Sequence, residues 1–161
     1  YPVSLASFAL GTPTRISAVG RLTDTGVDAH ASIILSGHAG TAAHAVLDTT
    51  LAARTPTVAS LSGDRARLEL PGPFFAPQAP TLISVTGERV TGPAPTLRGS
   101  DGLAHEAAHF AELVAHGRAE SPWLPWAESV AVMATLDAIR AQLGVRYPGE
   151  DAGLTAGREC G

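Results

Sequence analysis

One stretch of strict alternation limits the fold of this chain more than any other feature. In Val27–Ser36 the odd positions are all apolar, from Val27 through Ile33 to Leu35, whereas the even positions are mostly polar. A strand that alternates in this way has one face in a core and one face outside it. The chain is therefore expected to build a sheet that is covered on one side.

Further strand candidates surround this segment and are joined by short turns. They are predicted over Thr14–Leu22, Thr41–Thr50, Thr57–Leu61, Arg65–Leu70 and Thr81–Val85. The two strands on either side of the turn at 62–64 are predicted to form a hairpin. Close spacing with short turns favours antiparallel pairing. Loops are predicted over 71–80, which holds four prolines, and over most of 87–102.

Helices are expected at both ends of the chain. Pro2–Leu10 is small and apolar and is followed by Gly11, which predicts a helix that ends at the glycine. Two apolar stripes at helical spacing are predicted to face a core: Leu103, Ala107, Phe110 and Val114, then Val132, Leu136, Ile139 and Leu143. Strands followed by helices predict an α+β fold, with an open, mostly antiparallel β-sheet and helices packed on one face.

Length and composition narrow the function classes. The 161 residues fit one domain, predicted over 1–148, and the glycine-rich segment 149–161 is predicted to be a flexible tail. No apolar run is long enough to cross a membrane. A net charge of −4 without a basic cluster disfavours nucleic acid as a partner. The single cysteine, Cys160, cannot form an internal disulfide, so we expect a reducing, cytoplasmic environment.

The motif His105-Glu106-x-x-His109 is the most conspicuous short motif in the chain. On a helix it places two imidazoles one turn apart to bind zinc, with the glutamate as a general base. Glu128 follows at a spacing that resembles a third ligand. A zinc metallopeptidase-like domain is therefore an alternative function.

Helical geometry argues against this zinc site. At about 100° per residue, His105, His109, Glu112 and His116 lie opposite the Leu103 stripe and are predicted to form a solvated polar face. Glu128 is predicted to point toward the core. The ligands would not converge, so no metal site is predicted.

A dinucleotide cradle is missing from the sequence. No two glycines stand two positions apart, so the fingerprint G-x-G-x-x-G does not occur. The chain also lacks lysine, and it opens on Tyr1 rather than on methionine, as expected for a fragment.

Three runs in the sequence carry a family resemblance. They are PTRISAVGRLTDTGVD at 13–28, GLAHEAAHF at 102–110, and HGRAESP followed by PWAES within 116–129. In order and spacing they resemble the C-terminal domain of the Gfo/Idh/MocA oxidoreductase family, closest to its dimeric dihydrodiol dehydrogenase branch. The similarity extends from Tyr1 to about Pro148.

The resemblance implies a two-domain oxidoreductase. NAD or NADP would be bound mainly by an N-terminal Rossmann domain that is absent from this chain, so the fragment alone is predicted to be inactive. Tyr1 stands where the family has a catalytic residue, and Arg21 and Phe75 match positions near the substrate. Substrates would be sugars, polyols, dihydrodiols or related hydroxyl and carbonyl compounds.

A homodimer is predicted through the second face of the sheet. That face still carries Ile34 and Val46, and its small alanines permit close packing of sheets. A non-catalytic dimerisation module is the remaining alternative.

Overall fold

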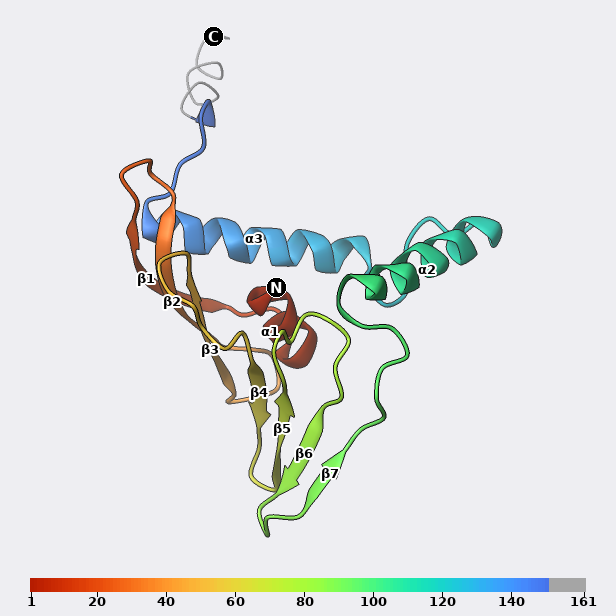
Figure 1. Cartoon of the computed structure of the whole chain (residues 1–161). Helices are drawn as coiled ribbons and strands as arrows, with labels where there is room; N and C mark the ends of the chain where they lie inside the picture. Colours follow the sequence, from red (N-terminus) through yellow and green to blue (C-terminus); the bar gives the residue numbers. More distant parts are fainter. Residues whose placement is uncertain (151–161) are drawn as a thin grey trace. The chain divides into compact units, whose positions relative to one another are not determined.

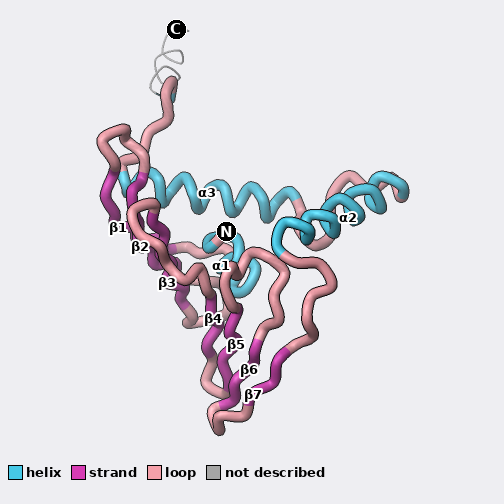
Figure 2. Tube along the Cα trace, in the orientation of Figure 1, coloured by secondary structure: helices cyan, strands magenta, loops and turns pink. Residues whose placement is uncertain are grey.

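The computed structural model describes residues 1–150, so that most of the predicted tail at 149–161 lies outside the described residues. The elements follow in the order α1 (Pro2–Leu10), β1 (Arg15–Leu22), β2 (Asp28–Ser36), β3 (His44–Thr50), β4 (Ala59–Ser62), β5 (Ala66–Leu70), β6 (Thr81–Ser84), β7 (Arg89–Thr91), η1 (Gly99–Gly102), α2 (Leu103–Ala115) and α3 (Trp126–Leu143) (Figures 1 and 2). All strand pairs are antiparallel. The predicted α+β class is confirmed.

The described chain divides into two compact units. The first consists of Tyr1–Arg54 together with the described residues from Pro125 onward, and the second is Thr55–Leu124. The strands form two sheets, one in each unit, with the orders β1-β2-β3 and β4-β5-β6-β7. Each sheet is a meander in which every strand pairs with its neighbours in sequence.

In the first unit, α1 and α3 cover one face of the three-stranded sheet. The alternation predicted for β2 is confirmed from Ala29 to Leu35, where the odd positions are buried and most of the even positions are exposed. Val27, which was also predicted to face the core, precedes the strand and is 44% exposed. Val3 of α1, Leu35 of β2 and Ile139 of α3 belong to one apolar core. This core fixes the two helices against the sheet.

A side chain of α3 also forms hydrogen bonds with backbone groups at the edge of the sheet. The Gln142 amide accepts a hydrogen bond from Ala18 N–H at 2.8 Å and donates one to the Ile16 carbonyl at 2.9 Å. Both backbone groups belong to β1, an edge strand that has no further strand beside it among residues 1–150. The amide thereby occupies backbone groups that another strand could otherwise pair with.

In the second unit, one face of the four-stranded sheet carries an apolar row, and the other carries charged residues around the buried Ile83. Leu61, Leu68, Leu82 and Val90 are successive cross-strand partners and form an apolar row. On the other face, Glu69 forms ion pairs with Arg67 and Arg89. The predicted hairpin of β4 and β5 is confirmed. The short elements β7 and η1 fall in the predicted loop, because three or four residues are too few to show a period.

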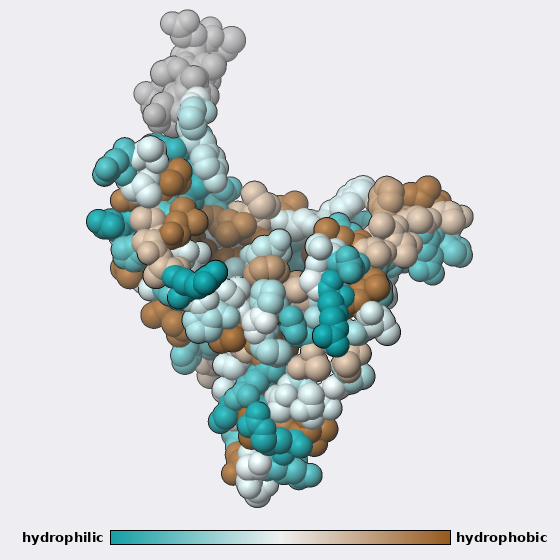
Figure 3. Space-filling model, viewed as in Figure 1, coloured by the Kyte–Doolittle hydropathy of each residue, from teal (hydrophilic) through white to brown (hydrophobic). Residues whose placement is uncertain are grey.

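The prediction that the Leu103 stripe of α2 faces a core is wrong for the described residues. Leu103, Phe110 and Val114 are 65%, 66% and 61% exposed, and no residue of this helix is buried. In Figure 3 the surface at α2 accordingly carries brown and tan areas. Apolar spacing identifies a helix but does not guarantee that the same chain covers its apolar side.

No helix among residues 1–150 is both long and apolar enough to cross a membrane.

Candidate functional site

Tyr1 lies at the start of α1 and is held there by the helix backbone. Its carbonyl accepts a hydrogen bond from Leu5 N–H at 3.0 Å. Pro2 occupies the first helical position, where its fixed φ favours the start of a helix. The Tyr1 side chain is 76% exposed. The phenol is therefore accessible to a molecule that approaches the first unit.

A hollow of about 190 Å³ adjoins Tyr1 within the first unit. Its walls are mostly apolar and come from α1, the inner face of the sheet and α3: Val3, Ala31, Ile33, Leu47, Leu136, Ile139 and Leu143. Asp28, Asp48 and Thr49 also line it. Such a hollow could hold a small apolar ring while the phenol acts as a hydrogen-bond donor or acceptor.

The sequence did not identify Asp28 as part of this hollow. Strict alternation places Asp28 on the outer face of β2, but the pairing with β1 is irregular between Arg21 and Leu22. Leu22 pairs with Asp28, and Asp28 is half-buried. A bulge of this kind changes the direction of a side chain and leaves no mark in a hydrophobic pattern.

Arg21, the predicted substrate-binding residue, lies on the outer face of the first sheet. Its cross-strand partner is His30, and both are exposed. The preceding residue, Gly20, faces α3, because a Cβ at Gly20 would lie 3.0 Å from Leu143 Cδ2. Successive strand residues point to opposite faces. The structure therefore does not bring Arg21 to the hollow beside Tyr1.

Phe75, the other predicted substrate-binding residue, belongs to the second unit. It is 48% exposed and meets Phe74 edge to face, with ring centroids 5.7 Å apart. Its place in the predicted proline-rich loop is confirmed.

His109 is the histidine of α2 that the structure holds most firmly. Its ring stacks on Trp123, with centroids 4.2 Å apart and planes 9° apart, and its Nε2 lies 2.9 Å from Ser121 Oγ. The prediction that His109 belongs to a solvated polar face is therefore wrong. The segment after α2 folds back over His109, whereas His105, Glu112 and His116 are exposed, as predicted for the polar face.

The hydrogen bonds of Ser121 determine which ring nitrogen of His109 carries the proton. Ser121 Oγ accepts from the backbone N–H groups of Trp123 at 3.1 Å and Leu124 at 3.3 Å. A hydroxyl oxygen has two lone pairs, so both are used. The Ser121 O–H must then donate to His109 Nε2. A neutral imidazole that accepts this hydrogen bond at Nε2 carries its hydrogen on Nδ1.

The groups of the zinc motif have other partners in the structure. His109 Nε2 is occupied by Ser121, and Glu128 Oε1 accepts a hydrogen bond of 2.6 Å from Ser7 Oγ in the first unit. Among residues 1–150, no group of three or more His, Cys, Asp or Glu side chains could hold a metal ion. The described geometry does not favour the metallopeptidase alternative.

One pair of charged groups has shifted pKa values. A hydrogen bond from Tyr147 N–H, and then one from the Arg140 guanidinium, hold the pKa of Glu150 below its ordinary value of 4.5. Glu150 in turn raises the pKa of Arg140. Both groups lie away from Tyr1 in sequence and line neither cavity, so they are interpreted as structural.

Comparison with known proteins gives relatives that carry the same enzyme name. The chain is 32% identical over 157 residues to trans-1,2-dihydrobenzene-1,2-diol dehydrogenase of Bos taurus, across 92% of this chain and 45% of the relative. The enzyme of the same name from Xenopus tropicalis is 33% identical over 143 residues, across 84% of this chain and 42% of the relative. The resemblance to the dihydrodiol dehydrogenase branch is confirmed. No family model matches the chain.

Solved oxidoreductases share the fold of this dihydrodiol dehydrogenase-like chain. A 3-ketoreductase from Actinomadura kijaniata in complex with NADP has a TM-score of 0.68 at 21% identity, over 89% of this chain and 45% of that one. The UDP-N-acetylglucosamine 3-dehydrogenase of Acidithiobacillus ferrooxidans has a TM-score of 0.72 at 17% identity, over 88% and 44%. The chain thus spans about half the length of the relatives it matches.

Proposed function

We propose that this chain is the substrate-binding and dimerisation half of an NAD(P)-dependent oxidoreductase. The reaction would interconvert a hydroxyl and a carbonyl group on a dihydrodiol, sugar, polyol or related compound. The similarity to named dehydrogenases over 92% of the chain supports the reaction class. The observation that carries the site is the position of Tyr1 beside the apolar hollow.

Tyr1 supplies the proton chemistry in this proposal. When a carbonyl is reduced, negative charge develops on its oxygen, and a proton donor within hydrogen-bond reach lowers the barrier. A phenol is protonated at neutral pH and can donate. The apolar walls, such as Leu47 and Ile139, would hold the carbon skeleton beside the phenol. In the reverse direction the phenolate accepts the proton of the alcohol.

The residues of this chain do not fit a dinucleotide cofactor. A dinucleotide cradle needs a strand followed by a glycine-rich turn and a helix N-terminus. In the described residues, each strand from β1 to β6 is followed by another strand, and β7 by η1. We therefore assign the cofactor to an N-terminal Rossmann domain, in the part of the relatives that this chain does not cover.

Arg21 and Phe75 remain predicted substrate contacts, and Arg21 could act only from the outer face of the sheet.

A homodimer through the outer face of the first sheet is part of the proposal. Val19, Ile34 and Val46 lie on that face and are 68%, 48% and 69% exposed. Ile34 and Val46 are direct cross-strand partners, so their apolar surfaces adjoin. Exposed apolar surface of this kind commonly marks an interface.

We also propose a cytoplasmic location, supported by the single cysteine.

Replacement of Tyr1 in the longer protein tests the function. Tyr1→Phe keeps the ring and removes the hydroxyl, so kcat should fall by about 100-fold or more while KM changes little. Tyr147→Phe is the matched control, since Tyr147 is the only other tyrosine of the chain and does not line the hollow. A Tyr1→Phe enzyme with nearly normal kcat would refute the role of Tyr1.

A cofactor titration of the 161-residue chain tests the other half of the proposal. The isolated chain should bind neither NAD+ nor NADPH and should turn over no dihydrodiol. Binding in the micromolar range would show that the nucleotide site lies in this chain after all.

A further inference from the structure

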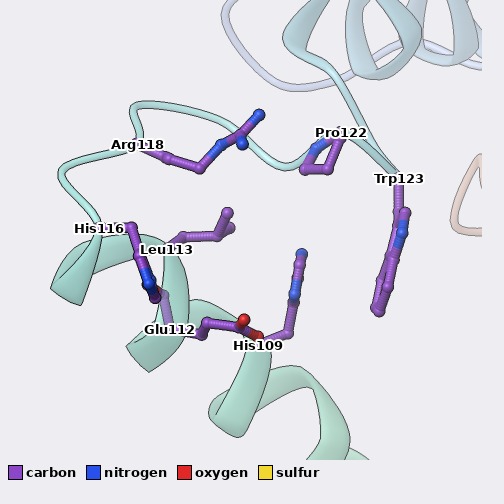
Figure 4. A pocket seen from close by; sticks show the side chains of 7 residues that line it. All are labelled: His109, Glu112, Leu113, His116, Arg118, Pro122 and Trp123. Carbon is purple, nitrogen blue, oxygen red and sulfur yellow. The ribbon is translucent and has the colours of Figure 1, made fainter.

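A second cavity, separate from Tyr1, lies wholly within the second unit. It measures about 410 Å³ and is lined by residues of α2 and of the segment that follows it: His109, Glu112, Leu113, His116, Arg118, Pro122 and Trp123. Because all of these residues fall within 109–123, the cavity is formed by one continuous piece of chain. Figure 4 shows their side chains around a common space.

Two opposite charges line this cavity without pairing. Within residues 1–150, neither the Arg118 guanidinium nor the Glu112 carboxylate forms a hydrogen bond or an ion pair with another side chain. In Figure 4 they lie on different sides of the space, Arg118 across from Glu112. The backbone N–H of Arg118 donates to the Leu113 carbonyl at 2.9 Å, which fixes the start of the segment. The cavity thus presents a cation and an anion that a ligand could meet together.

His116 adds a hydrogen-bond acceptor to the charged groups of Arg118 and Glu112. Its Nδ1 lies 2.8 Å from the backbone carbonyl of Glu112. A carbonyl can only accept, so Nδ1 carries the hydrogen, and in the neutral tautomer this leaves Nε2 as an acceptor. Two acceptors, the Glu112 carboxylate and His116 Nε2, therefore accompany the guanidinium donor.

The wall on the other side is held by a ring stack and hydrogen bonds and is partly apolar. Trp123 stacks on His109, and Ser121 holds both through the hydrogen bonds described above. Leu113 and Pro122 complete the lining with apolar surface. A site whose walls are fixed before binding loses less entropy when a ligand enters.

We propose that this cavity binds a small zwitterion, the chemical class of free amino acids. The ligand carboxylate pairs with Arg118, and the ligand ammonium donates to Glu112 and His116. Charge-assisted hydrogen bonds of this kind are stronger than neutral ones, and an arginine pairs with a carboxylate through two parallel bonds. A simple acid would leave Glu112 unpaired, and a simple amine would leave Arg118 unpaired. The proposal does not depend on the dehydrogenase function.

Calorimetric titration of the 161-residue chain tests the proposal. The zwitterions are glycine, β-alanine and γ-aminobutyrate, which differ in the separation of their two charges, and the comparison ligands are acetate, methylamine and lactate. At least one zwitterion should bind about tenfold more tightly than each comparison ligand. Trp123 fluorescence, recorded in a Trp126→Phe background, should change on binding and thereby report the location.

Neutralising either charge provides the decisive variants. Arg118→Gln and Glu112→Gln should each weaken zwitterion binding by about tenfold or more, with an unchanged circular dichroism spectrum. Arg98→Gln and Glu88→Gln remove the same charges outside the cavity and should leave binding unchanged. Absence of binding, equal binding of lactate or acetate, or binding that survives both cavity variants would overturn the proposal.

Discussion

Ser7 donates a hydrogen bond to Glu128 with 2.6 Å between Oγ and Oε1, although 121 residues separate the two along the chain. Ser7 is buried in α1, and Glu128 lies in the first turn of α3. This contact links the two helices that cover the first sheet. It also gives a structural role to the glutamate that the zinc hypothesis would have made a ligand.

Removal of the Ser7 hydroxyl should destabilise the first unit. A hydrogen bond to a charged acceptor contributes about 1.5–3 kcal/mol, so Ser7→Ala should lower the free energy of unfolding by about that amount. Urea unfolding followed by circular dichroism measures the change. Ser4→Ala in the same helix is the control, because Ser4 is exposed. Equal unfolding midpoints for the two variants would contradict the prediction.

Gly20 should not tolerate a side chain. A Cβ at this position would lie 2.3 Å from the His30 carbonyl oxygen and 3.0 Å from Leu143 Cδ2. Gly20→Ala should therefore cost about 1–3 kcal/mol, as overpacking does in other cores. Gly63→Ala serves as the control, since the nearest atom to its Cβ is 3.6 Å away. The prediction fails if both variants melt at the temperature of the parent chain.

Ser121 should hold the chain segment that follows α2. Its hydroxyl oxygen accepts from two backbone N–H groups and its hydrogen is donated to His109. Ser121→Ala leaves these groups to water, and the stacking of Trp123 on His109 should loosen. Acrylamide quenching of Trp123, measured in a Trp126→Phe background, should increase. Ser129→Ala, an exposed serine of α3, should leave quenching unchanged.

The ionised Glu150 carboxylate should stabilise the folded chain at neutral pH but not at acidic pH. Its pKa is lower in the folded chain than the ordinary 4.5, so its contribution is present above the unfolded-state pKa. That contribution is lost as the pH falls through the folded-state pKa. Glu150→Gln should be less stable than the parent at neutral pH, and the difference should vanish in urea unfolding once the pH is well below the folded-state pKa. Salt should reduce the difference, and a difference that persists in acid would contradict this origin.

The proposed dimer should depend on the outer face of the first sheet. Val46→Asp places a charge beside Ile34, its cross-strand partner. If this face is the interface, light scattering should show a shift from dimer to monomer. Val85→Asp introduces the same charge at a site 73% exposed in the second unit and should not shift the equilibrium. A parent chain that is already monomeric at tens of micromolar would rule the interface out.

Periodicity in the sequence predicted the longer elements and the inner face of the first sheet. Ala31, Ile33 and Leu35 alternate with exposed residues, and burial follows that alternation closely. The helix ends at Gly11 and Gly144 were also predictable, because a glycine follows each apolar run. Both glycines have positive φ in the structure. Such features depend on local sequence alone.

Other features depend on partners distant in sequence and could not be predicted in the same way. The division into two sheets is one of them, since every strand pair looks alike at the level of a hairpin. The packing of His109 against Trp123 is another, because a stripe pattern shows which side of a helix is polar but not what folds over it. The bulge that turns Asp28 inward is a third.

The interrupted first unit has a consequence for how the chain is made. Its sheet ends at Thr50, but the helix that covers the sheet, α3, begins at Trp126, after the whole second unit. During synthesis from the N-terminus, the inner face with Ile33 and Leu35 must wait until Ile139 leaves the ribosome. Exposed apolar surface of this kind is prone to aggregation and is a typical substrate of chaperones. The second unit, built from neighbouring hairpins, can fold during that delay.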